Sequence, residues 1–470
     1  MRRTKIICTM GPACRSEEKI EELCLAGMNV ARLNFSHGSH KEHKETIEMI
    51  KNVRKKLGLP IAILLDTKGP EYRIGVFENK SVTVEAGDEF TFTTDDIIGD
   101  SSRVSVSYKN LPLEMNPGDK ILVNDGLVSF EVTKTGKDFV RCTVITGGIL
   151  SDKKSMAFPG KVLEQIFLSE QDKADLLFGI ENDVDYVAAS FVSNAQNVID
   201  LKNFLKENGG EDIDVIAKIE NRSGVENIRE ICENCEGIMV ARGDLGVEIP
   251  FEELPAVQKR LITTCRLMGR RVITATEMLE SMTTNIRPTR AEISDVANAV
   301  YDGTSAVMLS GETAIGAHPA KVVEAMSLIC SETEENIPYN ELFFGGKFAI
   351  NNNIDAVSYA ACSMALTVGA KAITVCSISG KSARMVSRFR PDIDIIGLTT
   401  SEKAWRKLAL SWGVLPVLNE EYASPEIIFY SAAKATANTL KLQEGDNVVV
   451  VGSTVSGKQG GTNDIRLQTI

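Results

Sequence analysis

Residues 214–244, DVIAKIENRSGVENIREICENCEGIMVARGD, contain the pattern that decides the fold. An apolar run ends at Glu220, a helix-like stretch follows, and a second apolar run ends at Asp244. Both runs are apolar nearly throughout, as expected for parallel strands that are buried on both faces. The stretch therefore predicts two successive βα units with polar side chains at the strand ends.

The same unit recurs along most of the chain. Apolar runs predict eight strands, at 5–11, 29–35, 61–67, 185–192, 214–221, 237–244, 271–277 and 306–312. Helical patterns follow these runs, at 16–26, 40–57, 169–180, 194–208, 224–232, 255–268, 289–301 and 320–334. Several begin at residues that favour helix starts, such as Ser16, Ser169 and Thr289. Eight βα units are typical of an α/β protein with a (β/α)8 TIM barrel.

Two further units are predicted. Between the third and fourth runs, alternating segments such as 81–85, 89–93 and 128–132 indicate a small β-barrel-like lid domain on the active-site side. The last part of the chain predicts a C-terminal α/β domain with a mixed five-stranded sheet, with strands at 372–377, 395–400, 414–418, 447–452 and 465–470 and helices at 354–368, 382–390, 402–412 and 425–440. The expected domains are 1–70 with 159–338 (barrel), 71–158 (lid) and 339–470 (C-terminal).

Composition excludes several classes of protein. The 470 residues include 52 Lys or Arg and 64 Asp or Glu, a formal charge of −12, with 43% hydrophobic residues. No apolar run approaches the roughly 20 residues of a spanning helix, and the start of the chain lacks the features of a signal peptide. An acidic chain is a poor candidate for binding nucleic acid or anionic membranes. We expect a cytoplasmic protein with neither partner.

Polar residues end six of the eight predicted strands, where barrel enzymes place their chemistry. Glu220 and Asp244 end neighbouring strands, so their carboxylates can converge on one Mg²⁺ ion. Lys218 and Arg32 add positive charge that suits a phosphorylated substrate, as do Arg73 and Arg242. These residues indicate phosphoryl transfer or metal-enolate chemistry, and the two alternatives stay open at this point.

Several motifs resemble those of pyruvate kinases. They are ARLNFSHG at 31–38, LDTKGPE at 65–71, KIEN at 218–221, ARGDLGVE at 241–248, PTRAE at 288–292 and DGTSAVMLSGET at 302–313. They occur in the family's order over nearly the whole chain, inserted β domain included. The resemblance implies transfer of the phosphoryl group of phosphoenolpyruvate to ADP, giving ATP and pyruvate.

The resemblance also implies roles for individual residues. The implied catalytic residues are Arg32, Lys218, Thr276, Ser310 and Glu312. Substrate would be bound by Arg32, Lys218, Gly243, Asp244 and Thr276, and nucleotide by Asn34, His37 and Arg73. Glu220 and Asp244 would hold Mg²⁺ (or Mn²⁺), and Asn34, Ser36, Asp66 and Thr67 match the family's K⁺ site. The enolate would receive its proton from Thr276 or from a water near Ser310 and Glu312, and both routes stay open.

Two further expectations follow from the resemblance. In this family an acidic residue at the position of Glu71 accompanies K⁺ dependence, so we expect K⁺ to be required. The turn formed by Ser377, Ser379, Gly380, Lys381 and Ser382 matches the loop that binds a phosphorylated activator, often fructose 1,6-bisphosphate. Lys458 and Lys434 are candidate partners for a sugar-phosphate effector. The family also implies a homotetramer.

The chain departs from the family pattern at three places. Glu277 replaces the usual Gln and adds an acid near the site. The stretch 161–165 lacks the usual Val-Asp-Leu-Pro, which removes the expected support for a nucleotide contact there. Residues 462–464 read Thr-Asn-Asp in place of the more frequent Thr-Asn-Thr.

Three other motifs invite different interpretations. His37, His40 and His43 fall within seven residues but straddle a strand end, a loop and a helix start, which disfavours a metal site. The single CxxC at 232–235 has no second pair and favours incidental thiols over zinc or redox chemistry. The segment 452–458 nearly spells a Walker A loop, but Gln459 replaces the required Ser or Thr, so we favour an effector-phosphate loop.

Two other functions are alternatives to that of a pyruvate kinase. A phosphoenolpyruvate-type lyase or aldolase would share the metal and the enolate but not ADP, and the lid and Arg73 argue against it. A catalytically inactive sugar-phosphate sensor would use only the C-terminal domain. The presence of Lys218, Glu220, Asp244 and Thr276 argues against that.

Overall fold

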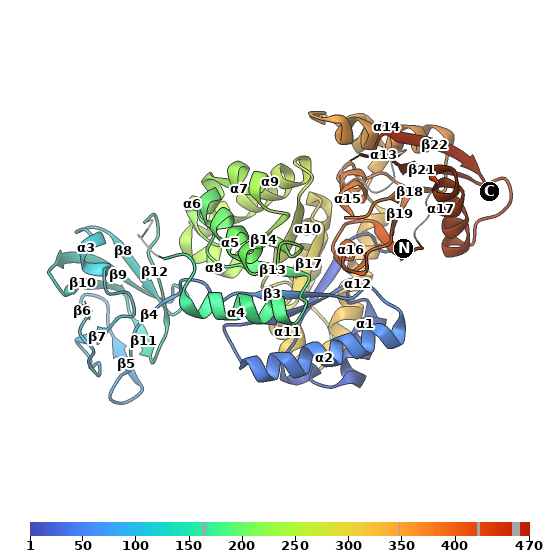
Figure 1. The fold of residues 1–470 in the computed structure, drawn as a ribbon. Coiled ribbons are helices and arrows are strands. Elements are labelled where there is room, and N and C mark those ends of the chain that lie inside the picture. The colour runs from blue at the N-terminus through green and yellow to red at the C-terminus, as the bar shows by residue number, and fades with distance from the viewer. Residues whose placement is uncertain (162, 164–165, 347, 421–423, 454–460) are drawn as a thin grey trace.

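The structure is a computed structural model that describes residues 1–470 except 162, 164–165, 347, 421–423 and 454–460. It contains a closed parallel barrel, an inserted β unit and a C-terminal α/β unit, arranged in a row with the barrel in the middle (Figure 1). In the part of the chain that is described, no helix is long and apolar enough to cross a membrane.

Eight parallel strands close the barrel in the order β1-β17-β16-β15-β14-β13-β3-β2. They are β1 (Lys5–Thr9), β2 (Val30–Asn34), β3 (Ala62–Asp66), β13 (Tyr186–Ala189), β14 (Asp214–Ile219), β15 (Gly237–Ala241), β16 (Arg271–Ala275) and β17 (Ala306–Leu309). One face of each strand fills the barrel interior and the other packs against the surrounding helices, so the strands are buried on both faces. The predicted TIM barrel is confirmed.

Helices surround the barrel close to their predicted positions. They are α1 (Glu17–Ala26), α2 (His40–Leu57), α4 (Glu170–Glu181), α5 (Ala195–Glu207), α6 (Arg222–Glu226), α7 (Ile228–Asn234), α9 (Leu254–Leu267), α10 (Arg290–Asp302) and α12 (Pro319–Glu335), with short 3₁₀ turns at Pro12–Cys14, Phe251–Glu253 and Glu280–Thr283. Ser169 and Thr289 cap α4 and α10 with reciprocal side-chain bonds. The single helix predicted at 224–232 is wrong: Asn227 ends α6 and precedes α7.

The predicted strands run one to three residues too far at their carboxyl ends. The run at 237–244 leaves the strand after Ala241, and its remaining residues begin a helix, α8 (Arg242–Glu248). The run at 306–312 likewise gives way to α11 (Gly311–Ala314). In both cases the backbone leaves the strand just before the predicted polar site residues, Asp244 and Glu312, which therefore lie on short helices.

The inserted β unit lies between β3 and β13. Its strands are β4 (Tyr72–Arg73), β5 (Ser81–Val84), β6 (Glu89–Thr93), β7 (Arg103–Ser105), β8 (Lys120–Val123), β9 (Val128–Thr135), β10 (Phe139–Thr146), β11 (Gly148–Ser151) and β12 (Ser155–Ala157), with one short helix, α3 (Leu111–Glu114). A seven-stranded sheet and the β5–β11 pair enclose one core, in which Phe90, Phe92 and Phe130 pack edge to face or tilted.

The C-terminal unit contains the mixed five-stranded sheet that was predicted. Its elements are α13 (Tyr339–Phe344), α14 (Asn353–Val368), β18 (Ala372–Cys376), α15 (Lys381–Ser387), β19 (Asp394–Thr399), α16 (Glu402–Leu408), β20 (Val414–Leu418), α17 (Pro425–Leu440), β21 (Asn447–Gly452) and β22 (Asp464–Thr469). The strand order is β20-β19-β18-β21-β22, and only the edge pair β21–β22 is antiparallel. Leu410, just after α16, joins the core inside the barrel.

Candidate active site

A buried lysine occupies the carboxyl end of β14. The Lys218 ammonium lies 2.8 Å from Glu220 Oε1 and 3.1 Å from Asp66 Oδ1, and it donates to Ser190 Oγ at 2.7 Å. Burial disfavours the ammonium, but the carboxylates of Asp66 and Glu220 outweigh it and raise the pKa of Lys218. Lys218 is therefore a fixed positive charge at the mouth of the barrel.

Arg32 on β2 adds a second fixed cation beside it. Its Nε lies 2.6 Å from Asp66 Oδ2, and its Nη1 donates to Thr9 Oγ1 at 2.9 Å. Asp66 at the end of β3 is fully buried, and although burial opposes ionisation, Arg32 and Lys218 lower its pKa. The carboxylate of Asp66 thus orients both cations toward the same opening.

Glu220 and Asp244 form the second half of the site. Glu220 is nearly fully buried, and its Oε2 accepts from the Phe191 N–H at 2.6 Å. Burial raises the pKa of Glu220 to about 7, with Asp244 adding to the effect, and burial also raises the pKa of Asp244. Two neighbouring carboxylates whose charge is disfavoured by burial fit a divalent cation held by two protein ligands and by substrate oxygens.

The loop after β16 presents Thr276 in a strained backbone conformation. Thr276 has φ +69°, a region that β-branched residues rarely adopt and that costs about 1–3 kcal/mol. Arg242 holds this turn in place, because its Nη2 donates to the carbonyls of Thr276 at 2.6 Å and Glu277 at 3.0 Å while its Nη1 pairs with Asp295 at 2.6 Å. Thr276 Oγ1 accepts from the Gly243 N–H at 2.8 Å, so α8 and this turn are joined at the site.

Ser310 and Glu312 lie at the end of β17. Glu312 is fully buried and accepts from the backbone N–H groups of Ser310 at 2.6 Å and Leu279 at 3.1 Å. Its carboxylate therefore fixes the backbone of two loops. The Ser310 hydroxyl is buried and has no hydrogen-bond partner among the described residues.

The four residues matched to a K⁺ site come from adjacent strand ends. Asp66 is engaged by Arg32 and Lys218, as described above. Asn34 Oδ1 accepts from the Ser36 N–H at 3.1 Å, and Thr67 Oγ1 accepts from the Ser190 N–H at 3.2 Å. Asn34 and Asp66 are direct partners in the ladder between β2 and β3, so these four residues lie at neighbouring strand ends.

The residues matched to nucleotide binding are less buried. Arg73 on β4 forms an ion pair with Glu71 and donates to the Lys153 carbonyl at 2.6 Å. His37 is exposed, and its carbonyl bonds to His43 at 2.9 Å. Arg73 thus extends from the inserted β unit while His37 belongs to the barrel.

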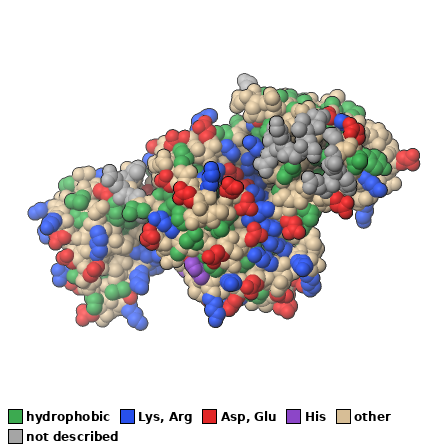
Figure 2. Space-filling model, in the orientation of Figure 1, with side chains coloured by type: hydrophobic (Ala, Val, Ile, Leu, Met, Phe, Trp, Pro, Cys, Tyr) green, Lys and Arg blue, Asp and Glu red, His purple; other side chains and the backbone are tan. Residues whose placement is uncertain are grey.

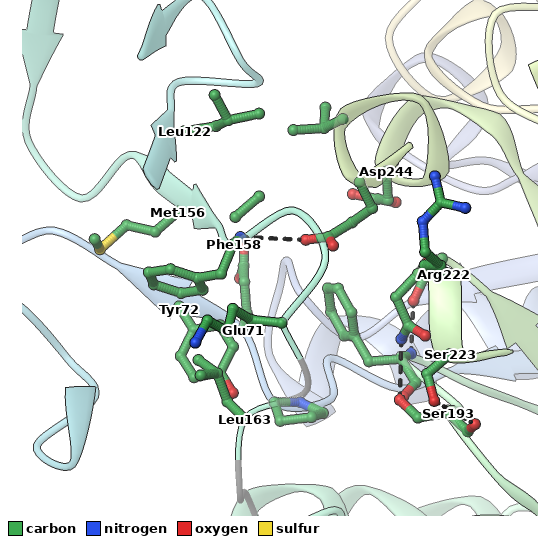
Figure 3. Close-up of a pocket in the computed structure, with 18 of the residues that line it drawn as sticks. Glu71, Tyr72, Leu122, Met156, Phe158, Leu163, Ser193, Arg222, Ser223 and Asp244 are labelled. Atoms are coloured by element: carbon green, nitrogen blue, oxygen red, sulfur yellow. Dashed lines mark hydrogen bonds between the residues drawn. The ribbon is translucent and has the colours of Figure 1, made fainter. Parts of the chain in front are cut away.

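A pocket of about 520 Å³ separates the inserted β unit from the barrel (Figure 3). Glu220 and Asp244 line it on the side of the charged site, and Glu71, Tyr72 and Phe158 line it on the side of the inserted β unit. Its size is within the usual range for small-molecule sites. The gap between the two units is thus wide enough for a substrate next to the carboxylates.

Sequence reasoning missed four residues of this site. Ser190 and Phe191, the latter with φ +58°, bond to Lys218 and Glu220. Glu248 accepts from the Phe158 N–H at 3.4 Å, and burial raises the pKa of Glu248 to about 7. Asp125 lies on the pocket wall. The apolar run 185–192 pointed to the position of Ser190, since strand ends carry the chemistry, but no motif singled it out.

The predicted effector loop connects β18 to α15. Gly380 is buried with φ +74°, and an added Cβ would lie 3.0 Å from Leu408. Ser382 is also buried, and its hydroxyl bonds to Thr462 Oγ1 at 2.6 Å, whereas Ser379 and Lys381 are exposed. The candidate Lys458 lies outside the described residues, as does most of the segment that resembles a Walker A loop.

The remaining histidine and cysteine motifs have local explanations. His40 bonds to Asp175 at 2.6 Å, and His43 stacks on Phe35 with ring centroids 4.2 Å apart. Cys232 is buried, with its sulfur 2.9 Å from that of Cys265. Within the described ranges, no three His, Cys, Asp or Glu side chains are grouped so that they could hold a metal ion.

A TIM barrel with fixed cations, paired carboxylates and a covering β unit fits an enzyme of the phosphotransferase class, and the comparisons with known proteins identify it as one. Family models match this chain at residues 1–323 (pyruvate kinase, barrel domain) and 355–468 (pyruvate kinase, alpha/beta domain). The chain belongs to the pyruvate kinase family.

Individual relatives are similar in sequence to this chain over its whole length. The pyruvate kinase of Clostridium acetobutylicum is 42% identical over 472 residues and that of Clostridium perfringens 43% over 474, each with both chains fully covered. The pyruvate kinase of Geobacillus stearothermophilus is 43% identical and is covered to 80% of its length. A crystal structure of a pyruvate kinase from Cryptosporidium parvum superposes with a TM-score of 0.94 at 36% identity, covering 100% of this chain and 96% of the other.

Proposed function

We propose that this enzyme transfers the phosphoryl group of phosphoenolpyruvate to ADP, giving pyruvate and ATP, with Lys218 as its central catalytic residue. The observation that carries the proposal is the position of Lys218, which is buried between Asp66 and Glu220 and lies in the same charged site as Arg32. Phosphoryl transfer is catalysed mainly by positioning and by stabilising charge on the moving group. A buried ammonium and a guanidinium supply that charge.

The carboxylates would bind the cation. Glu220 and Asp244 would hold Mg²⁺ (or Mn²⁺), which when bound neutralises charge on the phosphoryl oxygens. The Gly243 and Asp244 N–H groups with Thr276 would orient the substrate carboxylate, and Arg32 would hold the phosphate. Arg73, Asn34 and His37 would bind the nucleotide from both sides of the cleft. Thr276, or a water near Ser310 and Glu312, would deliver the proton to the enolate.

A coupled assay tests the proposal directly. Purified protein is expected to form pyruvate and ATP in equal amounts from phosphoenolpyruvate, ADP, Mg²⁺ and K⁺. Pyruvate without ATP would instead indicate a lyase or a phosphatase, and binding of sugar phosphates without turnover would indicate a sensor. Either result would overturn the proposal.

The role of Glu71 gives a prediction about K⁺. In Glu71→Lys, the fixed ammonium is expected to replace the mobile cation, so that rates in Na⁺ and K⁺ buffers agree within about twofold. Because Glu71 pairs with Arg73, the same change is expected to raise the KM for ADP. The wild-type enzyme should need K⁺, and Glu71→Gln, which adds no charge, should keep that need. Equal wild-type rates in both buffers would contradict the prediction.

The proposal also includes a binding site for an effector, a homotetrameric assembly and a cytoplasmic location. The loop of Ser377, Ser379, Gly380, Lys381 and Ser382, with Lys458, would bind a phosphorylated effector. The enzyme would act as a homotetramer in the cytoplasm, with domains at 1–70 plus 159–338, 71–158 and 339–470. The buried bond between Ser382 and Thr462 supports a loop that is held in shape while its other polar groups stay accessible.

A further inference from the structure

The Lys218 ammonium is enclosed by protein atoms. Figure 2 shows many Lys and Arg side chains on the visible surface, where water can solvate their charge. Lys218 is only 9% exposed, so the protein itself must accept most of its hydrogen bonds. Among the described residues, the acceptors are the carboxylates of Asp66 and Glu220 and the Ser190 hydroxyl, the last at 2.7 Å. The two carboxylates balance the charge of Lys218, and Ser190 adds a third contact that carries no charge.

The other hydrogen bonds of Ser190 fix the direction of its hydroxyl. Its single proton goes to the Thr67 carbonyl at 2.7 Å, the nearer of two acceptors, since Asp66 Oδ1 lies 3.5 Å away. The lone pairs therefore remain for the Lys218 ammonium, which can only donate. The Ser190 N–H also donates to Thr67 Oγ1 at 3.2 Å, so two bonds tie Ser190 to the end of β3. Because Ser190 is 2% exposed, water has little access to these bonds, and the hydroxyl is an acceptor whose direction is set by the neighbouring strand.

The turn that contains Ser190 also holds the carboxylate beside Lys218. Phe191 has φ +58°, an uncommon backbone conformation for a residue other than glycine, and such strain is typical of functional sites. In this conformation the Phe191 N–H donates to Glu220 Oε2 at 2.6 Å. Gly69 packs closely on the turn, because a Cβ added there would lie 2.7 Å from Ser190 Cβ. Two successive residues after β13 therefore hold both Lys218 and Glu220.

We propose that Ser190 is a positioning residue, whose hydroxyl holds the Lys218 ammonium at the place where the phosphoryl group is transferred. The inference rests on the proposed function and adds the group that fixes its central lysine. A lysine side chain is flexible and its ammonium is a point charge, so the carboxylates attract it without fixing its direction. The Ser190 oxygen, anchored on Thr67, supplies that direction. Because a misplacement of about 1 Å can lower a rate by about 10²-fold, loss of this contact should reduce turnover.

Steady-state rates of ATP formation by three variants test this role. Ser190→Ala removes the hydroxyl, and its kcat is expected to fall by about 10–100-fold while the KM for ADP stays within about twofold. Ser190→Thr and Ser190→Val add side chains of the same shape, but only threonine keeps a hydroxyl. The kcat of Ser190→Thr should therefore exceed that of Ser190→Val by about tenfold or more, even if the extra methyl group lowers both.

Ser387 provides a matched control outside the site. It is similarly buried, at 5% exposed, and its hydroxyl donates to the Trp412 carbonyl at 2.6 Å. Ser387→Ala therefore removes a buried bond from a serine hydroxyl to a backbone carbonyl but leaves Lys218 untouched. Its kcat should stay within about twofold of wild type, which shows that a buried serine can be lost without loss of turnover.

The outcomes distinguish this role from the proposed function itself. A wild-type protein that forms no ATP would overturn the proposed function and this inference with it. A wild-type protein that forms ATP, together with a Ser190→Ala variant within about threefold of its kcat, would overturn the role of Ser190 alone. Equal kcat values for Ser190→Thr and Ser190→Val would do the same, because the loss would then follow from packing. If Ser190→Ala fails to fold, the comparison of the threonine and valine variants decides.

Discussion

Replacing Lys218 with methionine is expected to lower kcat by about 10³-fold or more. Removing a single donor from a developing charge typically costs about 10²–10³ in kcat, and a full positive charge on a transferring phosphoryl group contributes about 10³–10⁵. Methionine preserves most of the side-chain volume, so the loss should fall on kcat and less on folding. Steady-state rates of ATP formation at saturating substrates provide the measurement.

A Lys→Met substitution on the surface serves as the control, because it shows the effect of losing a lysine outside the proposed site. Lys173→Met alters a surface lysine on α4 that pairs with Glu170 at 2.7 Å, and the kcat of this variant should stay within about twofold of wild type. The variants should also share a near-native circular dichroism spectrum. A Lys218→Met enzyme that retained its rate within a few-fold would refute the assignment of Lys218.

Replacing Glu220 with glutamine is expected to abolish activity at ordinary Mg²⁺ concentrations. The change removes a buried carboxylate that we propose as a metal ligand, and it removes one of the two ion pairs of Lys218 that the described residues contain. Even groups that only support a ligand change metal affinity by about 10–100-fold, so the Mg²⁺ activation constant should rise by at least that factor. Titrating the rate with MgCl₂ and with MnCl₂ gives this constant.

Glu226 provides a control inside the same cleft. It lines the pocket from α6 and is not one of the proposed metal ligands, so Glu226→Gln should leave the activation constant within about threefold of wild type. Excess metal should partly rescue Glu220→Gln. An unchanged activation constant in that variant would place the cation elsewhere.

The sequence allowed the fold to be predicted closely, for a physical reason. Strands such as β14 and β15 are buried on both faces, so each had to be a continuous apolar run, and such runs are visible without a structure. The ends were harder to locate. Arg242 and Asp244 follow β15 directly, and nothing local in the sequence shows that they begin a helix.

The site could be predicted where a charged residue ends a strand. Lys218, Glu220 and Asp66 were predicted because charge near a strand end has few structural explanations, and the structure brings them together with Arg32, which lies inside β2. Ser190 was missed because serine is common and its importance depends on a bond to a lysine on the neighbouring strand. The pairing of Ser382 with Thr462 crosses 80 positions and leaves no local pattern.

Helix α8 connects the two sides of the cleft. Its first turn contains Gly243 and Asp244, and its last turn contains Val247 and Glu248, which contact the inserted β unit at Gly126 and Phe158. Because α8 is a short helix of seven residues, it moves as one body, and a displacement at its last turn also moves its first turn. A movement of the inserted β unit away from the barrel would therefore also displace Asp244 from Glu220, so that the cleft would open to water and the proposed cation site would be lost in the same step.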